Sequence, residues 1–104
     1  MRLRSLWRAA LLAAAVPTAV HAQSQEGLYV RSLAATCASC HGTDGAAASG
    51  SAVPRLAGLP RDYLSTQLKA FKAGTRPSTI MTQLAKGYSD AQLEQIAAYF
   101  AAQK

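Results

Sequence analysis

The stretch TCASCHG, residues 36–42, holds both cysteines of the chain. Cys37 and Cys40 stand three positions apart, and His41 follows the second cysteine directly. Two thiols and an imidazole in this spacing allow a disulfide, a metal site, a redox-active pair or the covalent attachment of a cofactor. The rest of the sequence distinguishes between these kinds of chemistry.

Three of the four possibilities find little support elsewhere in the chain. A disulfide between Cys37 and Cys40 would close a very small loop and would leave His41 without a role. A thioredoxin-like redox pair needs a βαβ setting, and no alternating apolar and polar run predicts a strand. A zinc site needs about four ligands, and the sequence offers no second pair of cysteines or histidines.

Covalent haem uses every residue of the motif. Each thiol can add across one vinyl group of a porphyrin to form a thioether, and cysteines at i and i+3 on a helical turn point the same way. The histidine that follows can turn its ring under the iron. C-x-x-C-H is the pattern of c-type haem attachment. The sequence therefore predicts one covalent haem c, bound through Cys37 and Cys40, with His41 as an iron ligand.

The first 22 residues have the layout of a secretory signal peptide. Three arginines precede the apolar run AALLAAAV, residues 9–16, and Val20-His21-Ala22 offers a cleavage site. A membrane span needs ~20 apolar residues, so this run is too short to be one. We expect residues 1–22 to be removed and residues 23–104 to form a periplasmic cytochrome c domain without a membrane span.

The charge of the chain fits an exported protein with protein partners. The formal net charge is +6, and three of the eleven basic residues lie in the expected signal peptide, which leaves eight basic against five acidic residues, or +3. Export argues against a nucleic-acid partner. The basic excess suits either a solvated surface or a docking face for acidic partners.

Helical periodicity and the lack of strand signals predict an all-α fold. The expected helices run from Ser24 to about Ala35, from Arg61 to Ala73, and from a capping box of Ser89 and Gln92 onward. Residues 42–59 and 75–88 between them are expected to be irregular. Because both irregular stretches flank the same helix, we expect them to wrap one central object.

Met81 is the expected sixth ligand of the iron. It is the sole methionine after the expected signal peptide, and it lies in the second irregular stretch. A methionine can also be mere gap filler, but His/Met ligation is the usual arrangement of c-type haems. The alternatives are Lys86 or an open position. Iron with both axial positions filled suits one-electron transfer, whereas an open position would suit a haem-based enzyme or a gas sensor.

Three stretches of the chain resemble class I cytochromes c of the bacterial c4/c553 kind. They are CASCHG at residues 37–42, PRLAGLPRDYLSTQLKAFKAGTRP at 54–77 and TIMTQLAKGYSDAQLEQIAAYF at 79–100. The resemblance extends over most of residues 23–104. The segment TIMTQLAKGYSD resembles in particular the haem subunits of flavocytochrome c sulfide dehydrogenases.

The resemblance implies a small class I cytochrome c fold whose helices surround one haem. It implies thioethers on the two cysteines and axial ligation by His41 and Met81. It further implies that the Pro54 carbonyl accepts the other ring N–H of His41, and that Leu56 packs on the macrocycle.

The resemblance also implies how the chain folds and what it does. The first and last helices should cross near the attachment motif and bring Leu33 against Ile96 and Tyr99. The implied function is exported electron transfer, without catalysis by this chain itself. The chain would be either a free carrier or a haem subunit that receives electrons from a flavoprotein dehydrogenase.

Overall fold

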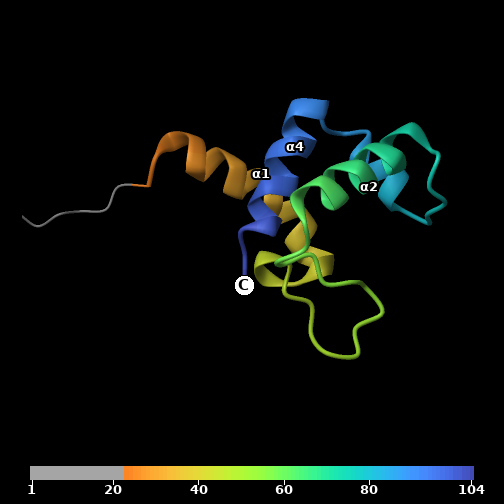
Figure 1. Ribbon diagram of the computed structural model, residues 1–104, viewed down its shortest axis with the longest axis horizontal. Coiled ribbons are helices and arrows are strands. Elements are labelled where there is room, and N and C mark those ends of the chain that lie inside the picture. The colour runs from red at the N-terminus through yellow and green to blue at the C-terminus, as the bar shows by residue number, and fades with distance from the viewer. Residues whose placement is uncertain (1–22) are drawn as a thin grey trace, which may run out of the picture.

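The computed structural model describes residues 23–104, so the signal peptide expected at residues 1–22 lies outside the described residues. The described part contains α1 (Gln25–His41), η1 (Thr43–Gly45), α2 (Arg61–Ala73), α3 (Met81–Ala85) and α4 (Asp90–Ala101). No strand occurs in residues 23–104, which confirms the all-α expectation (Figure 1). Within the same residues, no helix has both the length and the apolar character that crossing a membrane requires.

The helices α2 and α4 have the bounds that local sequence signals predict. Arg61–Ala73 is the predicted range of α2, and Gly74 ends the helix in the left-handed conformation with φ of 76°. At the start of α4, the Ser89 hydroxyl accepts the Gln92 N–H at 3.1 Å, and the Gln92 side chain accepts the Ser89 N–H at 2.9 Å. The expected capping box is therefore confirmed.

Helix α1 continues further than its apolar periodicity predicts. It begins after Ser24, whose hydroxyl accepts the Gly27 N–H at 3.1 Å, and it runs through the whole attachment motif to His41. Gly42 ends it with φ of 88° and an N–H that donates to the Ala38 carbonyl at 2.9 Å. The prediction that this helix ends near Ala35 is too short, and both cysteines lie on continuous helix.

The core forms where α1 and α2 pack on α4, and Figure 1 shows α1 crossing α4. Its buried members are Ala34, Leu64, Leu93, Ile96, Ala97 and Phe100. Burying one large apolar side chain of this kind stabilises a fold by about 1.5–3 kcal/mol. Ala34 is 1% exposed, and its small side chain lets α1 approach α4 closely. Leu33 and Tyr99 pack on the edge of the same cluster, as the resemblance implies.

The expectation that residues 75–88 are wholly irregular is wrong for the short helix α3, which packs on α2. Ser78 stabilises its first turn, because its hydroxyl accepts the Thr82 N–H at 2.9 Å. Met81 is therefore the first residue of a helical turn. The position of that turn relative to α2 sets the position of Met81.

Candidate haem-binding site

His41 is the best-defined candidate metal ligand of the predicted site. It is the last residue of α1 and is only 8% exposed. Its Nδ1 lies 2.7 Å from the Pro54 carbonyl oxygen, the contact that the resemblance implies. A carbonyl oxygen can only accept, so Nδ1 carries a proton, and in the neutral imidazole Nε2 then keeps its lone pair. This is the tautomer that binds a metal through Nε2.

The two cysteines lie one helical turn apart, and no disulfide joins them. Residues at i and i+3 are neighbours on a helix surface, with about 5–6 Å between their Cβ atoms. Cys40 is exposed and Cys37 is partly buried, and burial raises the pKa of the Cys37 thiol. A thiol that stays protonated is less prone to redox exchange than a thiolate.

Cys37, Cys40 and His41 together fit a covalently attached macrocycle. They offer two cysteine sulfurs on one helical face, with no disulfide between them, and an imidazole whose Nε2 is free to bind a metal. Within the described part of the chain, no group of three or more His, Cys, Asp and Glu side chains comes together to hold a metal ion. A metal at His41 would therefore need most of its ligands from a cofactor.

Met81 lies at the N-terminal end of α3, partly buried. In the view of Figure 1, the start of α3 lies apart from the C-terminal end of α1. Close to Met81 in the chain, Ile80 is 57% exposed and Leu84 is 36% exposed.

Leu56, expected to pack on the macrocycle, is partly buried against the edge of the core. Its N–H donates to the Gly45 carbonyl at 2.8 Å, and the Ala57 N–H donates to the same oxygen at 3.1 Å. These bonds tie the segment that carries Pro54 to the turn that follows His41. The structure thus brings Cys37, Cys40, His41, Pro54 and Leu56 into one region.

Asp44 belongs to this region, although the sequence does not identify it. It lies in η1 with φ of 54°, and its Oδ1 accepts a hydrogen bond from the Tyr99 hydroxyl at 2.5 Å. That hydrogen bond raises the pKa of Tyr99. The two residues are 55 positions apart, so no local pattern could have predicted their contact.

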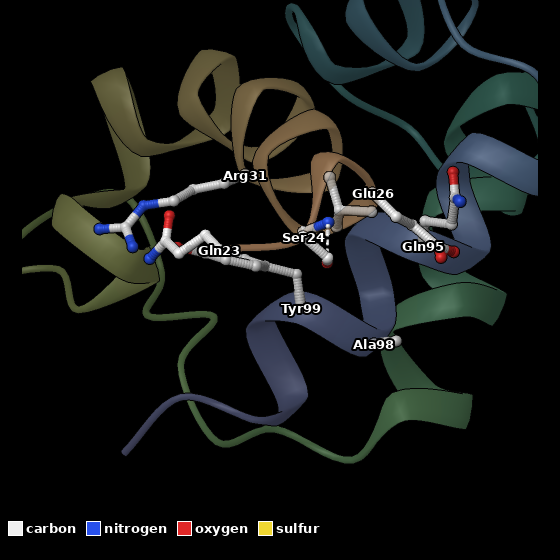
Figure 2. A pocket seen from close by; sticks show the side chains of 9 residues that line it. Gln23, Ser24, Glu26, Arg31, Gln95, Ala98 and Tyr99 are labelled. Atoms are coloured by element: carbon white, nitrogen blue, oxygen red, sulfur yellow. Dashed lines mark hydrogen bonds between the residues drawn. The ribbon is translucent and has the colours of Figure 1, made fainter. Parts of the chain in front are cut away.

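A surface groove lies between the start of α1 and α4, and neither cysteine lines it (Figure 2). Its lining residues are Gln23, Ser24, Glu26, Gly27, Val30, Arg31, Gln95, Ala98 and Tyr99. The lining contains no thiol, imidazole or thioether, so the groove is not the candidate haem site. Figure 2 shows that Tyr99 forms part of its wall, with Arg31 nearby.

Comparison with known proteins gives a family match. The family model for cytochrome c matches residues 30–104. The cytochrome subunit of sulfide dehydrogenase from Chlorobaculum tepidum is 46% identical over 68 residues, which cover 65% of this chain and 60% of that protein. The thiosulfate dehydrogenase electron acceptor of Thiomonas intermedia is 43% identical over 67 residues, covering 64% of this chain and 31% of that protein.

A solved structure shows the same likeness. Cytochrome c4 of Acidithiobacillus ferrooxidans matches with a TM-score of 0.59 and 44% identity, over 64% of this chain and 38% of that one. The chain thus spans less than two thirds of the length of each of these proteins.

Proposed function

This chain belongs to the cytochrome c family, and on that premise we propose that it is an exported one-electron carrier whose haem c iron is ligated by His41 and Met81. It has the class I cytochrome c fold and covalent haem c, and it is an electron-transfer protein. The observation that carries the finer proposal is the hydrogen bond between His41 Nδ1 and the Pro54 carbonyl, because it leaves Nε2 ready for iron.

The roles of the residues follow from their chemistry. Cys37 and Cys40 would hold haem c through thioethers, and the iron of this cofactor supplies one-electron redox chemistry. The hydrogen bond to Pro54 fixes the orientation of the His41 ring and makes the imidazole a stronger donor. The Met81 thioether would favour the ferrous state and raise the reduction potential.

Met81 is supported as the sixth ligand by its chemistry and its surroundings. It is the one methionine of the described residues, and it follows Ile80, whose apolar side chain is exposed. Lys86 and an open position are the alternatives. Ligation by Met81 would leave no position for oxygen or peroxide, which favours electron transfer over a haem-based enzyme or gas sensor.

The test removes the Met81 thioether from the mature holoprotein. The intact mass of that holoprotein should equal the chain from about Gln23 plus one haem. Ligation by methionine gives ferric haem a weak far-red charge-transfer band. We expect Met81→Ala to abolish this band, to lower the reduction potential and to allow rapid binding of carbon monoxide to the ferrous form. The measurements are absorption spectra, redox titration and stopped-flow binding of carbon monoxide.

Leu84→Ala is the matched control, since it shortens an exposed apolar side chain of the same helix and keeps the thioether. It should keep the band and the slow binding of carbon monoxide, as should Lys86→Ala. A wild-type protein that lacks the band and binds carbon monoxide rapidly would contradict His/Met ligation and favour sensing or catalysis.

The partner and the location follow from the relatives and from the expected signal peptide. One relative is a subunit of sulfide dehydrogenase and another accepts electrons from thiosulfate dehydrogenase. These names support a dehydrogenase, with a flavoprotein as first choice, as the electron donor of this chain. Removal of residues 1–22 during export would place the carrier in the periplasm, where that donor would have to be.

A further inference from the structure

We propose that Tyr99 is a positioning residue for His41, acting through Asp44 and the turn that holds Pro54. The inference rests on the proposed role of His41 as an iron ligand. It concerns a part of the site that lies beyond the attachment motif, on the last helix. A network of hydrogen bonds and short chain segments connects Tyr99 to the imidazole.

The network starts on α4 and ends at the His41 ring. The Tyr99 hydroxyl donates to Asp44 Oδ1 at 2.5 Å. The carbonyl of the next residue, Gly45, accepts the Leu56 N–H at 2.8 Å. Two residues before Leu56, the Pro54 carbonyl accepts the His41 Nδ1–H at 2.7 Å. A shift of the η1 turn would therefore move the acceptor that orients the ring.

The backbone conformation of Asp44 shows why the turn needs a stabilising contact. Its φ of 54° lies in the left-handed region, which aspartate tolerates better than most residues but which still costs about 1–2 kcal/mol. Such a conformation persists when the surroundings hold it in place. The hydrogen bond from Tyr99 is the side-chain contact that does so, and it comes from a well-packed helix.

Backbone packing on α4 provides a second support that does not depend on the hydroxyl. A Cβ added to Gly45 would lie 2.6 Å from the Phe100 ring, so the turn rests directly on that ring. The Gly58 N–H also donates to the Phe100 carbonyl at 2.9 Å. Loss of the Tyr99 hydroxyl should therefore loosen the turn without unfolding it.

The effect should appear at the iron. A weaker hydrogen bond from His41 to Pro54 makes the imidazole a poorer donor, which destabilises ferric relative to ferrous iron. The Tyr99→Phe holoprotein keeps the aromatic ring but loses the hydroxyl. It should show a raised reduction potential, a shifted His41 ring signal in the ferric NMR spectrum and faster solvent exchange of the Nδ1 proton.

Four further variants sharpen the test. Asp44→Gly removes the acceptor, and glycine is compatible with the positive φ. It should change the reduction potential, the His41 ring signal and the exchange of the Nδ1 proton in the same directions as Tyr99→Phe does. The double variant Tyr99→Phe/Asp44→Gly should show no larger changes than either single variant. Asp44→Asn keeps an acceptor oxygen and should stay close to the wild type. Tyr63→Phe removes the hydroxyl of an exposed tyrosine on α2 and should change none of them.

A potential and a Nδ1 proton exchange rate that do not change in either Tyr99→Phe or Asp44→Gly would overturn the inference, and so would additive shifts in the double variant. If one variant fails to take up haem, the other decides. Failure of His/Met ligation itself would be recognised separately, because the wild type would then lack the far-red band.

Discussion

At the scale of the residue, the site depends on backbone conformations that only glycine adopts easily. Gly42 follows His41 directly and has φ of 88° and ψ of 159°, a region that is essentially limited to glycine. A Cβ at this position would lie 2.8 Å from backbone atoms of Ala46 and Ala47. Because backbone cannot move aside as a flexible side chain can, the turn from α1 into η1 tolerates no side chain here.

We expect Gly42→Ala to destabilise the holoprotein by at least about 1–3 kcal/mol, from the conformational strain alone. The clash with Ala46 adds to that cost and should displace the turn, so the reduction potential should change too. Denaturant unfolding and redox titration measure the two effects. Gly50→Ala is the control, since its φ is 81° but a Cβ would meet nothing within 4 Å. Equal losses in both variants would show that the close backbone contact is unimportant.

At the scale of the element, the sequence predicts best those helix bounds and caps that depend on residues close together in the chain. The bounds of α2 and the capping box of α4 depend on residues within one or two helical turns, so the sequence predicts both. Helix α3 is not predicted, because a helix of five residues is stabilised by its packing on α2. The last turns of α1 are not predicted either, because the attachment motif has no apolar periodicity. The hydrogen bond between Tyr99 and Asp44 joins residues 55 positions apart, which no local pattern encodes.

The contact between α2 and α4 is also charged at its surface. Glu94 of α4 accepts hydrogen bonds at 2.5 Å from Lys69 and at 2.5 Å from Ser65, and it lies 3.7 Å from Arg61. The hydrogen bond from Lys69, followed by that from Ser65, lowers the pKa of the Glu94 carboxyl. A second pair joins Lys72 to Asp90 at 2.9 Å, and it lowers the pKa of Asp90.

The lowered pKa of Glu94 predicts a pH-dependent contribution to stability. The folded state stabilises the charged carboxylate more than the unfolded state does. This contribution to the free energy of unfolding is therefore present above the ordinary pKa of 4.5, and it is lost as the pH falls through the lower pKa of the folded state. Glu94→Gln should therefore lower the melting temperature near neutral pH, and the difference from wild type should shrink in acid.

Thermal unfolding of both holoproteins between pH 7 and pH 3, at low and high salt, measures this difference. Salt should reduce it, because the pair with Lys69 is exposed. Asp62→Asn is the control, because Asp62 takes part in no ion pair among the described residues. A difference for Glu94→Gln that stays constant across the pH range would contradict the assignment.

At the scale of the whole molecule, charge and apolar surface meet beside Met81. Arg61 and Lys69 share the carboxylate of Glu94, and Lys72 pairs with Asp90. Lys86 takes part in no ion pair within residues 23–104 and follows α3, whose neighbourhood includes the exposed Ile80 and Leu84. This combination suits docking in which charge steers the encounter and apolar contact completes it.

A free carrier and a fixed subunit should respond differently to salt. Residues 23–104 carry eight basic and five acidic side chains, so encounter with an acidic partner is favoured by long-range attraction. The Debye length falls from ~10 Å at 0.1 M to ~3 Å at 1 M salt, so the rate of electron transfer to a diffusing carrier should fall steeply over that range. Stopped-flow reduction of the holoprotein by a flavoprotein dehydrogenase, with sulfide as the first substrate to try, measures this rate.

Lys86→Gln should lower the transfer rate at low salt and flatten its salt dependence, if the surface beside Met81 is the docking face. Lys104→Gln removes an equal charge at the C-terminal end and should have the smaller effect. A subunit held by apolar contact would instead show almost no salt dependence and would elute with its partner on gel filtration. That pair of results would contradict the free carrier, whereas monomeric elution with a salt-sensitive rate would contradict the subunit.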